Sequence, residues 1–207
     1  MNEGYEDVLQ SIASSEPTPG GGSVAALSLA HAHSLAIMVA RLTVGKEKWS
    51  DGHEAAESVI SNSHTGLGVA LQLAENDAAA FETVMSAYRL PRNSDEDKEN
   101  RAKSIREATI GAAEAPLETA TEALELLSDI EALCHSCNSN ALTDLASAAE
   151  LSHTTVIIAS MNVRINLDFI KGEDVDRISS CIGEVLVGSS NSLERIRSMV
   201  SERLGWQ

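Results

Sequence analysis

Aromatic residues are scarce in this 207-residue chain, where Phe, Trp and Tyr together make up 3% although 43% of the residues are hydrophobic. The core must therefore be built from Ala, Leu, Val and Ile, whose small side chains suit closely packed helices. Stretches that alternate apolar and polar residues over the length of a strand are also lacking, which argues against a sheet. We predict an all-α protein with one helical domain over residues 1–207.

Basic residues are also few, with 15 Lys and Arg against 31 Asp and Glu, so the formal net charge is −16 at pH 7. This charge opposes long-range attraction to nucleic acid or to an anionic membrane surface, and we expect neither as a partner. An acidic, lysine-poor surface also suits a protein that stays soluble in high salt. A halophilic protein is therefore a hypothesis, which a salt titration of folding tests.

The chain has only three cysteines, an odd number, and its first residues show no signal-peptide pattern. We expect free thiols in a reducing cytoplasm, and we expect no apolar run to reach the length needed to span a bilayer. Cys134 and Cys137 form a C-x-x-C pair, but no second pair completes a zinc site, so we expect no metal. His31 and His33 point to different faces of one predicted helix and are expected to be packing residues.

The stretch Ser15–Ala26, SEPTPGGGSVAA, is the least ordinary part of the chain. Pro17 and Pro19 stiffen an extended approach, and Gly20–Gly22 have no Cβ and tolerate positive φ. Ser23 then stands where the N-cap of a long apolar helix is expected. A stiff arm, a bare backbone and free helical N–H groups would let a ligand come close, although a flexible linker is the plainer alternative.

Helical spacing of apolar residues recurs along the chain, and the Ala-rich segments 23–43 and 141–168 are expected at the centre. Pro116 either interrupts a helix or begins a new one. Gly66 and Gly68 mark either a kink or a close helix crossing. The predicted helices cover 5–14, 23–43, 51–89, 95–133, 141–168 and 173–204.

Two groups of polar side chains are candidates for chemistry. Asp77 precedes three alanines and a Phe, and burial there would raise its pKa enough to make it a proton donor near neutral pH. The alternative is an ordinary surface carboxylate. Asn162 and Asn166 lie one turn apart in an apolar helix, so their amides need partners from a neighbouring helix or from a heterocyclic ligand.

Several blocks then carry a resemblance to a known family: PTPGGGSVAA at 17–26, LTVGK at 42–46, DAAAF at 77–81, RLPRN at 89–93, NSNALTD at 138–144 and NVRINL at 162–167. In their order they resemble the formiminotetrahydrofolate cyclodeaminase / methenyltetrahydrofolate cyclohydrolase family. The resemblance implies a multihelical bundle that forms a homodimer. Cys137 and Ile158 stand where the family pattern has glycine.

The resemblance implies a tetrahydrofolate one-carbon derivative as substrate, with a polyglutamate tail as one form, and no tightly bound cofactor. Hydrolysis of 5,10-methenyltetrahydrofolate to the 10-formyl form is favoured, because a fused formiminotransferase domain is absent from these residues. Cyclisation of 5-formiminotetrahydrofolate with release of ammonia is the alternative. A non-catalytic folate-binding module is a third hypothesis, motivated by Cys137 and Ile158.

The resemblance also implies roles for individual residues. Asp77 would be the catalytic acid, the glycine arm would meet the pterin, the Asn/Asp groups would bind its edge, and cations would meet the glutamate tail. The predicted substrate-binding residues are Pro19, Gly20, Gly21, Gly22, Ser23, Lys46, Arg92, Asn138, Asn140, Asp144, Asn162 and Asn166.

Overall fold

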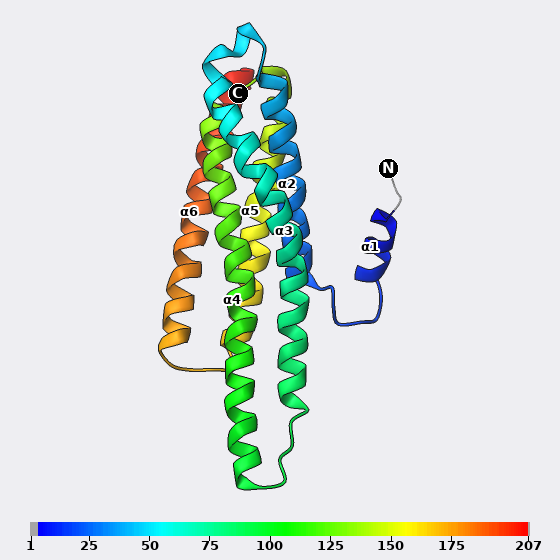
Figure 1. The fold of residues 1–207 in the computed structure, drawn as a ribbon. Helices are drawn as coiled ribbons and strands as arrows, with labels where there is room; N and C mark the ends of the chain where they lie inside the picture. Colours follow the sequence, from blue (N-terminus) through cyan, green and yellow to red (C-terminus); the bar gives the residue numbers. More distant parts are fainter. Residues whose placement is uncertain (1–3, 207) are drawn as a thin grey trace.

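The computed structural model describes residues 4–206, which form six α-helices and two short 3-10 turns and contain no strand (Figure 1). The prediction of an all-α fold is therefore confirmed. The elements are α1 Tyr5–Ile12, α2 Gly21–Thr43, η1 Glu47–Gly52, α3 His53–Tyr88, α4 Asp95–Cys134, η2 Ser139–Ala141, α5 Leu142–Leu167 and α6 Glu173–Leu204.

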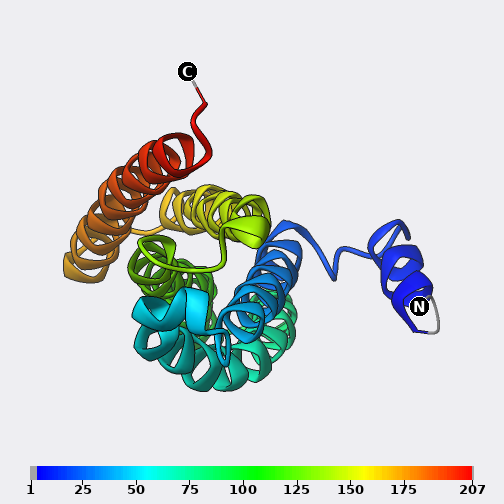
Figure 2. The same cartoon turned by 90° about the horizontal axis from the view of Figure 1, so that it is seen from above.

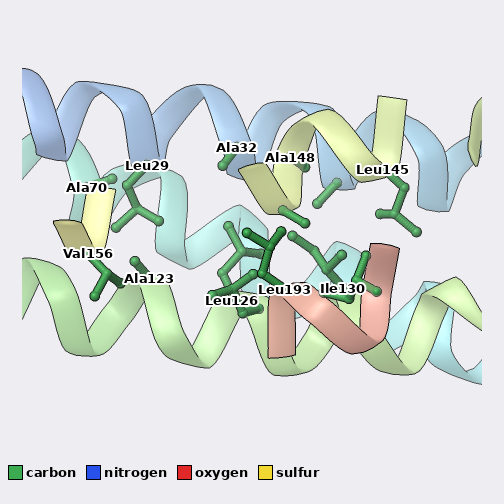
Figure 3. Packing of buried hydrophobic residues seen from close by; sticks show 14 of the residues in the cluster. Leu29, Ala32, Ala70, Ala123, Leu126, Ile130, Leu145, Ala148, Val156 and Leu193 are labelled. Carbon is green, nitrogen blue, oxygen red and sulfur yellow. The ribbon is translucent and has the colours of Figure 1, made fainter. Parts of the chain in front are cut away.

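Helices α2 to α5 form a closed bundle in which each helix runs antiparallel to the next (Figures 1 and 2). α2 packs on α3 and on α5, α4 packs on α3 and α5, and α6 covers the outer side of α4 and α5. The core contains no Phe, Tyr or Trp among the fully buried large side chains of residues 4–206. Leu29, Leu126, Ile130 and Val156 fill it between alanines, as the composition predicts (Figure 3).

α4 passes through Pro116 without a break, so both alternatives for this residue, an interruption and the start of a new helix, are wrong. Proline has no N–H, which leaves the carbonyl of Ala112, four residues earlier, without its helical donor. The side-chain Nδ2 of Asn166 on α5 donates to this carbonyl at 2.8 Å. A side chain of the neighbouring helix thus replaces the missing intrahelical bond.

α3 is likewise continuous through Gly66 and Gly68. Gly66 lies directly against the ring of His33 on α2, and a Cβ at this position would collide with the ring. Of the two alternatives for these glycines, the close helix crossing is correct for Gly66. Gly68 has open space around it.

The expectation that no apolar run is long enough to span a bilayer is wrong for α2. Among the described helices, Gly21–Thr43 is long and apolar enough by length and composition to cross a membrane, with a mean hydropathy of 1.6 in its most apolar window. In this fold 61% of that window is buried, against α3 and α5.

Two parts extend from the bundle. The backbone of α1 stands apart from the bundle, and none of its residues is buried, but its Tyr5 hydroxyl lies 3.3 Å from Nε2 of His31 on α2 (Figures 1 and 2). The C-terminal part of α3 and the N-terminal part of α4 form a hairpin that continues beyond the point where α2 begins (Figure 1). The start of α2 therefore lies at the base of this hairpin.

Candidate functional site

The glycine arm enters α2 earlier than its sequence predicts. Gly20 is the extended N-cap residue and α2 begins at Gly21, so the prediction of Ser23 as N-cap is wrong. None of the three glycines has a positive φ. Ser23 is buried inside the first turn, and its hydroxyl turns to α3 instead of capping its own helix.

The Ser23 hydroxyl lies 3.1 Å from the carbonyl oxygen of Ala74 and 3.1 Å from Oδ2 of Asp77. Asp77 is half-buried on α3. Burial raises the pKa of its carboxyl above the ordinary value, while hydrogen bonds from the side chain and backbone of Ser23 lower the pKa and offset part of that rise. Asp77 therefore holds its proton more firmly than a surface aspartate does.

The absence of a side chain at Gly22 makes this arrangement possible. A Cβ on Gly22 would collide with the carboxyl group of Asp77. At Gly21 a Cβ would come within 3.6 Å of Nδ2 of Asn162 on α5. Gly22 is thus required for the close approach of α3 to the start of α2, whereas a Cβ at Gly21 would make only an ordinary contact with α5. A left-handed backbone is not the reason for either glycine.

Asn162 and Asn166 present a free acceptor each. Nδ2 of Asn162 donates to the carbonyl of Ile158, and Nδ2 of Asn166 donates to the carbonyls of Ala112 and Asn162. Within residues 4–206, neither side-chain Oδ1 accepts a hydrogen bond. The amide donors are therefore used to tie α5 to α4 and to itself, and the oxygens remain for a ligand.

These groups converge on a cleft of about 340 Å³ between the arm, the start of α2, and helices α3, α4 and α5. The sequence analysis did not predict the apolar wall of this cleft. Phe81 follows Asp77 by one helical turn and Ile165 follows Asn162 by nearly one, so the helical spacing alone could have placed both apolar side chains beside the predicted polar ones. The lining residues are Pro17, Thr18, Gly20, Gly21, Gly22, Asp77, Phe81, Val84, Ala112, Asn162, Ile165 and Asn166.

Other predicted site residues lie elsewhere in the chain. Lys46 follows α2, and Asn138, Asn140 and Asp144 lie around η2 and the start of α5. Nδ2 of Asn138 donates to the carbonyl of Leu42 at 3.0 Å, which places this group at the C-terminal end of α2. Because α2 has 23 residues, this end is about 35 Å along the helix from the cleft.

Arg92 lies in the connection between α3 and α4, at the far tip of the hairpin. Pro19 belongs to the arm, next to Thr18 and Gly20, which line the cleft, but it is not itself a lining residue. The binding roles of these two residues, and of the group at the far end of α2, stay predictions.

The C-x-x-C pair is also remote from the cleft. Burial raises the pKa of the Cys134 thiol to about 12 and also raises that of Cys137. Arg203 of α6 donates to the carbonyls of both cysteines and to the Cys137 sulfur. The pair thus fastens the end of α4 to α6, and neither Cys137 nor Ile158 lines the cleft.

Comparisons with known proteins agree with this arrangement. The family model described as Formiminotransferase-cyclodeaminase matches residues 4–180. The chain belongs to this family. A methenyltetrahydrofolate cyclohydrolase of Methylorubrum extorquens is 35% identical over 80% of this chain and 79% of its own length.

Two further family members differ in how much of them the chain spans. The formimidoyltransferase-cyclodeaminase of Mus musculus is 32% identical over 85% of this chain but only 34% of its own length. The crystal structure of formiminotetrahydrofolate cyclodeaminase from Thermotoga maritima superposes with a TM-score of 0.85 at 27% identity, covering 99% of this chain and 97% of that one. The cyclodeaminase-like bundle predicted from the sequence is confirmed.

Proposed function

We propose that this protein is a folate one-carbon enzyme that hydrolyses 5,10-methenyltetrahydrofolate to 10-formyltetrahydrofolate. The observation that carries the proposal is the Asp77 carboxyl, held by Ser23 against the bare start of α2 inside the cleft. The relative from Methylorubrum extorquens, matched over most of both chains, bears the name of this activity and supports the choice.

The reaction needs one proton to move twice. Water adds to the carbon between N5 and N10, which gives a tetrahedral carbon that bears a hydroxyl group. The bond from this carbon to N5 then breaks as N5 takes up a proton, and the hydroxyl group loses its remaining proton to solvent as it becomes the formyl C=O, so one proton is released overall. Ionised Asp77 accepts the proton from the attacking water and returns it to N5. A carboxyl whose pKa is raised towards neutrality suits both steps.

The charge of the cleft suits the substrate. The methenyl bridge is cationic, and among the described lining residues Asp77 is the only charged side chain. In a partly water-excluded cleft its negative charge favours the bound cation more than it would in bulk water.

The remaining lining groups suit a pterin. Phe81 and Ile165 offer apolar faces to a flat ring, and the free Oδ1 atoms of Asn162 and Asn166 are placed to accept from its N–H groups. The glutamate tail would then run along the α3–α4 hairpin towards Arg92. Arg92→Ala is expected to raise KM more for polyglutamylated than for monoglutamylated substrate, and an equal effect on both would contradict this path.

Cyclodeamination of 5-formiminotetrahydrofolate is the second candidate, favoured by the full-length similarity to the Thermotoga maritima cyclodeaminase. Two assays separate the candidates. The hydrolase consumes the methenyl chromophore, whereas the cyclodeaminase forms it from the formimino substrate and releases ammonia. Folate binding without either turnover would instead support a binding module.

We also infer that the protein forms a homodimer. We infer separately that it works in a cytoplasm of high salt content. The amphipathic α1 supports the dimer, because it exposes 49% of Tyr5, 37% of Val8 and 49% of Leu9. This face lies across a groove of about 370 Å³ from apolar residues of α2 and α3, among them Leu27 and Leu71, and a second copy would fill that groove. Light scattering is expected to find a dimer that Leu9→Asp weakens and that Gln10→Asp, on the same helix, leaves intact.

A contribution of the Asn138 group or Lys46 to the cleft would require such a second copy, because both lie at the far end of α2 within one chain.

A further inference from the structure

A second cavity, of about 480 Å³, lies between α2, α3 and α4 and is separate from the folate cleft. His33, one of its lining residues, follows Ser23 by ten positions on α2, which places the cavity about 15 Å along the helix from the cleft. The lining residues are His33, Ser61, Asn62, Thr65, Gly66, Val69, Glu122, Glu125, Leu126 and Asp129.

His33 is a buried polar group without a partner. The residue is 5% exposed, and neither ring nitrogen makes a hydrogen bond to any residue within 4–206. Burial lowers the pKa of the ring to about 4, so the imidazole is neutral at physiological pH and has one acceptor and one donor nitrogen. Such an unpaired group is costly to bury unless something bonds to it.

The α4 side of the cavity is acidic. Glu122, Glu125 and Asp129 line it, and no Lys or Arg is among its lining residues in the described chain. Burial raises the pKa of Glu122, and repulsion from Glu125 and Glu118 raises it further. Nδ2 of Asn62 donates to Oδ2 of Asp129 at 3.1 Å and holds that carboxylate at the rim.

We propose that this cavity binds an aliphatic diamine or polyamine. One ammonium group would donate to the acceptor nitrogen of His33 and to Glu122, and the second would meet Asp129, two turns further along α4. The alkyl chain would lie over Leu126 and Val69. No group of His, Cys, Asp and Glu in residues 4–206 has the arrangement of a metal site, so an organic cation fits these residues better than a metal ion.

Calorimetric titration of the full chain with 1,4-diaminobutane at fixed ionic strength tests the proposal, with ammonium chloride and sodium chloride as parallel arms. We expect saturable binding of one diamine per chain and weaker binding of ammonium. Glu122→Gln should weaken the diamine about tenfold, because a charged hydrogen-bond acceptor is lost. Asp129→Asn should weaken it as well.

Glu118→Gln is the matched control, because it removes the same charge from α4 outside the cavity, and it should change the affinity less than about twofold. Asp77→Asn, in the folate cleft, should leave diamine binding unchanged. In protein labelled at the histidine ring nitrogens, the diamine should shift the His33 signals and leave those of His31, which is exposed, in place.

Three results would overturn the proposal. Binding that never saturates, or that Glu118→Gln weakens as much as Glu122→Gln, would show general attraction to an acidic surface. Ring signals of His33 that do not respond to bound diamine would mean that the diamine binds elsewhere and not against this imidazole.

Discussion

At the scale of single residues, the proposed activity depends on how closely Asp77 approaches the backbone of α2. The carboxyl group occupies the space that a side chain at residue 22 would need. Its pKa is set by two opposed effects, burial and the Ser23 hydrogen bonds, and burial is the larger. Substitutions at Gly22 or Ser23 should therefore change the turnover rate by moving the Asp77 carboxyl or by shifting its pKa.

Gly22→Ala should displace the Asp77 carboxyl, because the new Cβ would occupy its position. Loss of catalytic geometry on this scale typically reduces the rate about a hundredfold, and kcat/KM for the methenyl substrate measures it. Gly68→Ala is the control, since a Cβ there meets nothing within 4 Å, and it should keep full activity and stabilise α3 by about 1 kcal/mol. Equal activities of the two variants would contradict the tight approach.

Ser23→Ala should shift the pH dependence of kcat/KM. The Ser23 hydrogen bonds favour the ionised form of Asp77 and lower its pKa, so removing the hydroxyl raises that pKa. If ionised Asp77 is the base, the acidic limb of the profile moves to higher pH. Ser28→Ala is the control, because its hydroxyl donates to the Val24 carbonyl, and its profile should match the wild type. A shift to lower pH would be contrary to the assignment.

At the scale of elements, helix ends and helix pairs are fastened by side chains that are distant in sequence. Asn166 of α5 supplies the donor that Pro116 removes from α4. Asn138 serves the end of α2: its backbone N–H donates to Oγ1 of Thr43 and its Nδ2 to the carbonyl of Leu42. The Asn166 bond fixes the helices beside the cleft, and the Asn138 bonds fix the other end of the bundle, where α2 ends.

Asn138→Ala should destabilise the fold, since it removes a side-chain bond and leaves the Leu42 carbonyl unpaired. The expected cost is about 1–3 kcal/mol, and Tm falls by about 2–4 °C per kcal/mol in a domain of this size. Asn140→Ala, at an exposed side chain, should leave Tm unchanged. An unchanged Tm with a raised KM in Asn138→Ala would instead support the substrate contact predicted from the sequence.

Sequence patterns predict the helices and part of the site, because both depend on local spacing. Helical periodicity places the main helices to within a few residues, and α4 begins at a local capping box formed by Ser94 and Asp97. Asp77, Asn162, Asn166 and the glycines meet in one cleft, as the shared motifs suggest.

What the sequence does not reveal depends on pairings across the fold. Ser23 looks like a helix cap until α3 is seen beside it, and the pairing of Asn166 with Ala112 links residues 54 positions apart. The contact between His33 and Gly66 likewise exists only where α2 crosses α3. Local patterns contain no information on which helix faces which.

At the scale of the whole molecule, the net charge of −16 is the dominant property. The seven ion pairs found within residues 4–206 are largely exposed, so they compensate little of the repulsion among the acids. Repulsion of this kind destabilises a compact state, and salt relieves it by screening.

Stability should therefore increase with salt. Between about 0.1 M and 1 M KCl the screening length falls from about 10 Å to about 3 Å, and we expect Tm to rise over this range. Sucrose, which favours compact states without screening charge, is the comparison and should raise Tm less. A Tm that is constant or falls in KCl would argue against the high-salt hypothesis.

The measurement that tests the central proposal most directly is the loss of 5,10-methenyltetrahydrofolate absorbance with wild-type protein and with Asp77→Asn. We predict turnover above the uncatalysed rate for the wild type and none for the variant, with folate binding retained. The variant should also be at least as stable at pH 7. Because burial raises the folded-state pKa, ionised Asp77 costs stability above the unfolded-state pKa, and Asn carries no such charge. Wild-type turnover that persists in a folded Asp77→Asn protein would contradict the role of Asp77, and wild-type protein without turnover would contradict the hydrolase.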